Sequence, residues 1–116
     1  MSLKPCPSSP NCVSSQADPD DAEHFMNPVP FSIQPSAVLE AAVNAVTSAG
    51  GEVTATDAAS LDAVFASGLF RFKDDVRFEV DEQARLLHFR SASRTGHSDL
   101  GVNRKRMESL LAALAL

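Results

Sequence analysis

Alternation of apolar and polar residues dominates the second half of the chain. Val76, Phe78 and Val80 alternate with charged residues, which is typical of strands that bury one face. Four such runs are expected to form strands, at 52–57, 60–66, 76–81 and 86–93. The second is expected to continue through 69–72 after a bend or bulge at Gly68. Because the connections are short, neighbouring strands should pair in antiparallel hairpins.

Helical periodicity flanks this region on both sides. One helix is predicted to start at Pro35 and to end at Gly50. Its repeating apolar positions are Val38, Ala41, Ala42, Ala45, Val46 and Ala49. A last helix is expected to begin near Ser98 or Asp99, either of which could cap it. Its apolar face would comprise Leu100, Met107, Leu110, Leu111 and Leu114.

Proline breaks the pattern in residues 1–33, which hold six of the seven prolines. We expect an irregular arm there, because proline removes backbone donors. The part after His24 should lie against the core through Phe25, Met26, Val29, Phe31 and Ile33.

Residues 34–116 should then form a single α+β domain, a two-layer sandwich of element order α-β-β-β-β-α. Both helices would cover one face of an antiparallel sheet of about four strands. The opposite face would be polar, with Arg77, Glu79, His88 and Arg90.

Composition narrows the classes of function. The chain has 116 residues, a net charge of −5 and neither Trp nor Tyr, which argues against nucleic-acid binding. No run of about 20 apolar residues predicts a membrane span, and no signal peptide is expected. The sequence alone predicts a cytoplasmic protein, or an exported or membrane-associated one if a segment precedes it or its cysteines are oxidised.

Positive charge is concentrated where the last strand leads into the last helix. Residues 85–106 hold six Lys or Arg and one acid, whereas the other 94 residues hold four and 14. Helix starts favour anions through unpaired N–H groups. The expected ligand is a small anion or an acidic protein segment, and the candidate binding residues are Ser91, Ser93, Arg94, His97, Asp99, Asn103 and Arg104.

The same residues also fit a structural role. Helical geometry places Asn103 within the apolar stripe, and a buried amide needs partners. Ser91 and Ser93 take inward positions on the last strand, so a hydrogen-bond network could fix the last helix to the sheet. In that alternative Asp99 itself fills the anion position.

Asp74 and Asp75 could serve acid–base chemistry or hold a divalent cation. Neighbouring residues on a strand face opposite ways, however, and the hairpin brings Asp75 near the level of Arg90. A structural ion pair is the favoured interpretation.

Cys6 and Cys12 could form a small disulfide loop, stay as free thiols, or serve redox or metal chemistry. Two thiols without a matching Cys or His pair do not complete a zinc site, so no metal is expected. No motif for a nucleotide, a catalytic nucleophile or another cofactor is present.

Three segments carry a family resemblance. They are Cys-Pro-Ser-Ser-Pro-Asn-Cys-Val-Ser-Ser at 6–15, Phe-Arg-Phe-Lys-Asp-Asp-Val-Arg-Phe at 70–78 and Arg-Ser-Ala-Ser-Arg-Thr-Gly-His-Ser-Asp-Leu-Gly-Val-Asn-Arg at 90–104. They resemble the family called domain of unknown function 1499, which occurs in bacteria and photosynthetic eukaryotes. The resemblance implies that these segments are the family signature and that members often lie in or near membranes or export routes. It implies no catalytic residues.

Three functions fit these observations. The favoured one is a non-catalytic binding or accessory module with a basic corner. The alternatives are a hydrolase or isomerase for an acidic small molecule, with His97 as base and Arg94 as anion clamp, and a purely structural domain.

Overall fold

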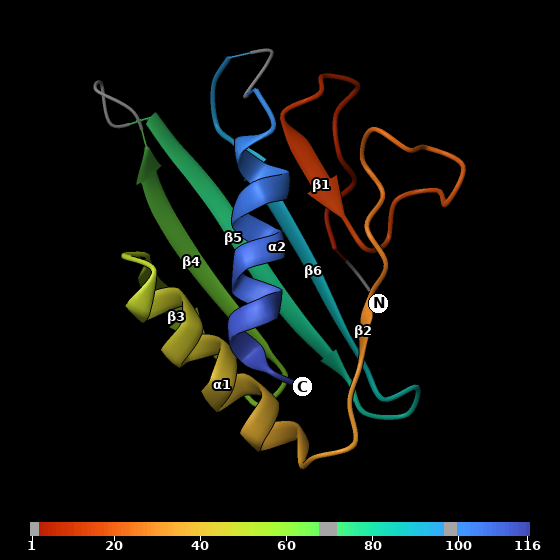
Figure 1. Cartoon of the computed structure of the whole chain (residues 1–116), viewed down its shortest axis with the longest axis vertical. Helices are drawn as coiled ribbons and strands as arrows, with labels where there is room; N and C mark the ends of the chain where they lie inside the picture. The colour runs from red at the N-terminus through yellow and green to blue at the C-terminus, as the bar shows by residue number, and fades with distance from the viewer. Residues whose placement is uncertain (1–2, 68–71, 97–99) are drawn as a thin grey trace.

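The computed structural model describes residues 3–67, 72–96 and 100–116. Along the chain, the elements are β1 (Cys12–Ser14), β2 (Val29–Pro30), α1 (Pro35–Ser48), β3 (Glu52–Thr56), β4 (Ser60–Ser67), β5 (Phe72–Asp81), β6 (Leu86–Ser93) and α2 (Val102–Leu114). The strands form one antiparallel sheet in the order β1-β6-β5-β4-β3, and β2 also pairs with β6. Figure 1 shows α1 and α2 crossing the same face of this sheet.

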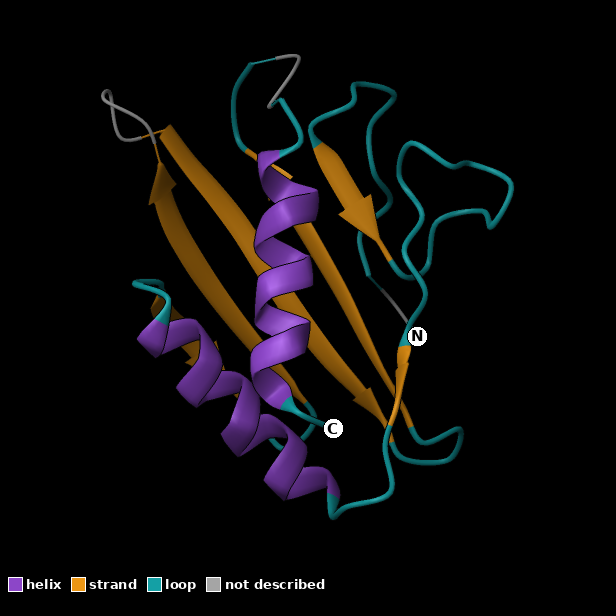
Figure 2. Cartoon of the chain, viewed as in Figure 1, coloured by secondary structure: helices purple, strands orange, loops and turns teal. Residues whose placement is uncertain are grey.

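The fold is therefore α+β, as predicted, with helices in one layer and strands in the other (Figure 2). The core lies between the layers, where β5 and β6 place Phe78 directly opposite Phe89 and both rings are fully buried. Their strand alternation sends Arg77 and Arg90 together to the outer face of the sheet.

Small residues bring α1 close to the sheet. Ala42 and Ala45 on its inner face are buried. Just after the helix, Gly51 lies against the ring of Phe65, where an added Cβ would approach ring carbon to 2.5 Å. The predicted helix end is also correct, because Gly50 follows it with a φ of 89°.

The sheet has two more strands than the four predicted. Both extra strands, β1 and β2, come from the segment predicted to be irregular and pair with β6. Burial also reaches back before His24, since all residues from 11 to 15 are buried. Of the expected anchors after His24, Phe31 is buried, whereas Ile33 is 43% exposed.

The start of the last helix differs from the prediction. α2 begins at Val102, after Gly101 with a φ of 80° and Leu100 with a φ of 54°. These left-handed conformations interrupt the helical pattern, and Leu100 is consequently 87% exposed rather than buried. The proposed capping residues Ser98 and Asp99 lie outside the described residues, as do Gly68 and 69–71. Phe72 was expected to continue the second strand, but it begins β5 instead and pairs with Ser67 of β4. Within the described residues, no helix is long and apolar enough to cross a membrane.

Candidate functional site

Three of the predicted site residues meet in a buried network between β6 and α2. The Asn103 Oδ1 atom accepts a hydrogen bond of 2.6 Å from the Ser91 hydroxyl, and its Nδ2 donates to Ser93 Oγ at 2.9 Å. The same Nδ2 donates to the Asn11 carbonyl at 3.2 Å, which ties the arm to both elements. Asn103 and Ser91 are 0% exposed, so this amide joins three segments of the chain inside the protein.

The network continues into a buried ion pair. Arg106 donates to Asn103 Oδ1 at 3.0 Å, and its other terminal nitrogen lies 2.8 Å from Asp74 Oδ2. The guanidinium also lies over the Phe65 ring, 4.8 Å from its centroid. The Asp74 and Arg106 side chains are 3% and 11% exposed, so most of the attraction between them is unscreened by water.

Arg94 lies on the outer side of the sheet and is exposed. Its Nε and a terminal nitrogen both donate to the Asp75 carboxylate at 2.9 Å, which raises the pKa of Arg94. Asp74 and Asp75 therefore face opposite sides of β5, and each pairs with a different arginine. The partner of Asp75 is Arg94, and not Arg90 as its level in the hairpin suggested.

Arg104 holds the arm rather than facing an open surface. One terminal nitrogen lies within 3.1–3.2 Å of the carbonyls of Ala22, Glu23 and Phe25. The remaining predicted site residues, His97 and Asp99, lie outside the described residues.

A shallow groove runs over the outer face of the sheet, beside the first residues of the arm. It consists of two adjoining depressions of about 420 Å³ each, and both are lined by Lys4, Asp75 and Arg90. Arg94 lines the depression nearer the end of β6. We call the four residues Lys4, Asp75, Arg90 and Arg94 the basic groove.

Arg90 is the most unusual residue of the basic groove. One terminal nitrogen donates to the Pro5 carbonyl at 3.3 Å, while the buried Nε has no hydrogen-bond partner among the described residues. Burial lowers the pKa of Arg90, and the nearby Asp75 carboxylate opposes this effect. Strand alternation correctly predicted that Arg90 lies on the outer face of the sheet. The approach of Lys4 and Pro5, from the other end of the chain, had no signal in the local pattern.

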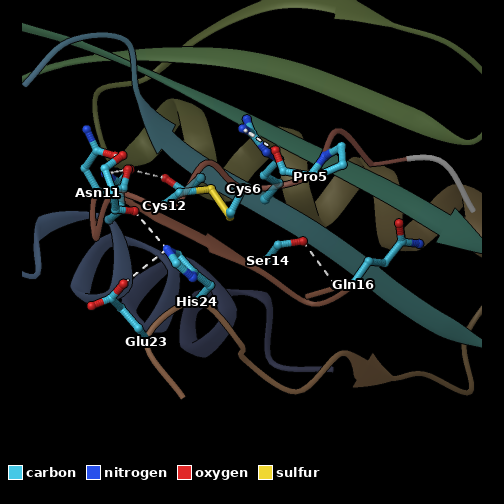
Figure 3. Close-up of a disulfide and its surroundings, with 12 residues drawn as sticks. Pro5, Cys6, Asn11, Cys12, Ser14, Gln16, Glu23 and His24 are labelled. Carbon is cyan, nitrogen blue, oxygen red and sulfur yellow. Dashed lines mark hydrogen bonds and ion pairs between the residues drawn. A yellow bond between two sulfur atoms is a disulfide. The ribbon is translucent and has the colours of Figure 1, made fainter. Parts of the chain in front are cut away.

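Cys6 and Cys12 form a disulfide, which is one of the states that the sequence left open. Figure 3 shows the bridge beside Pro5, with His24 next to the loop that it closes. Cys12 belongs to β1 and pairs with Ala92 of β6, so the disulfide links the first residues of the arm to the sheet. No cluster of three metal-ligating side chains occurs in residues 3–67, 72–96 and 100–116.

His24 clamps the disulfide loop to the next turn of the arm. Its Nδ1 lies 2.6 Å from Asp21 Oδ2, and its Nε2 lies 2.8 Å from the Ser9 carbonyl oxygen. Only the imidazolium form can donate at both positions. The Ser9 carbonyl, followed by the Asp21 carboxylate, raises the pKa of His24 from its usual 6.5, although burial opposes this.

Stability should therefore depend on pH through His24. Because its folded pKa is raised, its contribution is fully present below pH 6.5 and is lost as the pH rises through the folded pKa. Denaturant titrations from about pH 6 to 9 should show the stability difference between wild type and His24→Gln shrinking with pH. A difference that stays constant over this range would contradict the clamp.

A serine and a histidine also meet on the outer face, a pair that sequence reasoning missed. Ser15 Oγ lies 2.9 Å from His88 Nδ1, and burial lowers the pKa of His88. The hydroxyl also accepts a hydrogen bond of 2.9 Å from the Phe89 amide, and Ser15 is only 5% exposed. The pair therefore ties the arm to β6 and leaves the hydroxyl little access to a substrate.

Fold and site together define a small α+β domain whose N-terminal arm is joined to the sheet by a disulfide and borders a basic groove. The chain belongs to the family described as Protein of unknown function (DUF1499), whose sequence profile matches residues 2–114. The comparisons with curated proteins and with solved structures found no significant match.

Proposed function

We propose that this domain is a non-catalytic binding module that holds a small anion, or the carboxylate of an acidic partner segment, in the basic groove. The observation that carries the proposal is the half-buried Arg90 side chain, whose Nε has no partner among the described residues although two open depressions adjoin the side chain. A buried donor without an acceptor is costly, and an anion would supply the missing acceptor.

The charges of the basic groove support the same ligand class. The two depressions are lined by the four cations Lys4, Arg77, Arg90 and Arg94 and by the two carboxylates Asp62 and Asp75, so positive charge is in excess. Asp75 forms a forked pair with Arg94, a geometry that an external carboxylate or phosphate would reproduce. The Asp75 carboxylate therefore occupies the position on Arg94 that the carboxylate or phosphate of a ligand would take. The ligand would compete with Asp75 for Arg94.

The other described residues of the predicted basic corner have a supporting role in this proposal. Ser91, Ser93 and Asn103 satisfy one another inside the protein, and Arg104 is engaged by the arm carbonyls. Their part is to hold β6 and the arm in place behind the groove, while Arg94 is the predicted residue that would touch the ligand.

Anion titration of purified variants tests this proposal. Wild type should bind inorganic phosphate or citrate, and Arg94→Gln should bind roughly tenfold more weakly, because it loses a charge-assisted hydrogen bond. Asp75→Asn should bind more tightly, because the internal competitor is gone. Isothermal titration calorimetry and anion-dependent melting temperatures measure both effects.

Lys105→Gln is the matched control, because Lys105 is exposed on α2 and does not line the groove. It removes one positive charge, as Arg94→Gln does, and should leave anion affinity unchanged. Equal losses in these two variants would indicate a general charge effect and would overturn the proposal. So would a wild-type protein that binds none of phosphate, citrate or an acidic peptide.

A further inference from the structure

Residues 3–7 cross the outer face of the sheet as a short strap. Leu3 is buried and its amide donates to Gln16 Oε1 at 3.0 Å. Pro5 accepts the hydrogen bond from Arg90, and Cys6 forms the disulfide with Cys12. Lys4 lines both depressions of the basic groove and a third, of about 520 Å³, on the other side of the strap. The strap is therefore a wall of the groove.

The strap and the loop that follows it are held in different ways. Ser9 is fixed by His24 at its carbonyl and by Asn11 at its hydroxyl. Lys4 and Pro5, by contrast, precede the disulfide and are held in place by it. Their further attachments among the described residues are the buried Leu3 side chain and the hydrogen bonds at Leu3 and Pro5, one of which is long at 3.3 Å. After cleavage of the disulfide, the strap would be only weakly attached to the sheet. The loop around Ser9 would keep its hydrogen bonds to His24 and Asn11.

We propose that the Cys6–Cys12 disulfide is a redox switch for the basic groove. In the oxidised protein it keeps Lys4 in the depression that Arg94 also lines and keeps the Pro5 carbonyl on Arg90, so the cationic side chains stay in the geometry that binds an anion. In the reduced protein the strap leaves the sheet and anion affinity falls. This inference rests on the proposed function, because it concerns the same groove.

The exposure of the two cysteines decides which sulfur atom a reductant attacks. Cys12 is 0% exposed and Cys6 is half-buried, so a dithiol reductant has access to the Cys6 sulfur. Its thiolate attacks Cys6 Sγ, the S–S bond breaks, and the Cys12 thiolate leaves and takes up a proton. The second thiol of the reductant then displaces Cys6. The products are two protein thiols and one oxidised dithiol, a transfer of two electrons.

Phosphate or citrate titration of the oxidised and dithiothreitol-reduced protein is the first test. The reduced protein should bind roughly tenfold more weakly, because the groove is no longer preorganised. Lys4→Gln should weaken binding in the oxidised state and have no effect in the reduced state. The variant Cys6→Ser/Cys12→Ser should bind like reduced wild type and be insensitive to the reductant. Equal affinity of wild type in both redox states would overturn the switch while leaving the proposed function intact.

A second measurement follows the strap without any ligand. Phenylglyoxal labelling, read by peptide mass spectrometry, should modify Arg90 faster after reduction, because the Pro5 carbonyl no longer holds its guanidinium. Arg104, which is held by carbonyls of the arm beyond the disulfide loop, should label at the same rate in both states. Unchanged labelling of Arg90 would overturn the switch even if the oxidised protein binds anions. Faster labelling with no anion binding would reject the proposed function alone.

Discussion

Asp74→Asn is expected to destabilise the folded protein by about 3–5 kcal/mol, because it leaves the buried Arg106 guanidinium without its counter-charge. The two side chains are 3% and 11% exposed and lie 2.8 Å apart, so water cannot replace the lost carboxylate. The new amide would also turn a donor or a neutral oxygen toward the cation. Denaturant unfolding followed by circular dichroism measures the change in the free energy of unfolding.

Asp75→Asn is the matched control, one residue along the same strand. It makes the identical chemical change but breaks a pair whose two side chains are about half exposed. Exposed pairs contribute about 0–1 kcal/mol, so this variant should remain close to wild type in stability. Similar losses at the two positions would show that burial does not set the strength of the Asp74–Arg106 pair.

Asn103→Leu is expected to cost about 2–4 kcal/mol, because it leaves several buried polar groups without their partner at once. The Ser91 hydroxyl, the Ser93 hydroxyl and the Asn11 carbonyl all bond to this amide. Leucine has a similar volume, so the loss would measure hydrogen bonding more than packing. The same unfolding experiment measures it.

Asn44→Leu provides the control for that substitution, because Asn44 is exposed on α1. It should change stability by less than about 0.5 kcal/mol. A near-neutral Asn103→Leu would remove the network from the account of the fold. Since Asn103 and Asp74 both contact Arg106, their double variant should lose less than the sum of the two single losses.

Local periodicity predicted the two helices and the four longer strands, although β5 begins at Phe72 and not at the expected Val76. The bounds of β6 and the start of α1 agree with the structure, because alternation and helical spacing follow from backbone geometry alone. The same geometry correctly sent Asp74 and Asp75 to opposite faces of β5. It also placed Asn103 near Ser91 and Ser93, since inward positions at a strand's end and a helix's start must converge.

Strands of two or three residues were beyond such reasoning. β1 has three residues and β2 has two, too few to display a period, and β2 contains a proline. Their pairing is stabilised by an existing edge of the sheet, which β6 offers, and not by their own composition. The start of α2 was missed for a related reason, because the left-handed conformations of Leu100 and Gly101 override an apolar spacing that continues through them.

The sequence by itself determined the α+β class, most of the buried positions of the two helices, the alternation of inward and outward residues on the central strands and the segment that carries the positive charge. These features depend on neighbours a few residues apart, where the backbone permits few choices. Tertiary structure alone decided which arginine each aspartate meets, that Cys6 and Cys12 are joined, and that Lys4 and Pro5 lie against Arg90, 85 residues from Pro5. Such partnerships arise from the path of the whole chain, because many pairings of opposite charge are locally equivalent until the core fixes their distance.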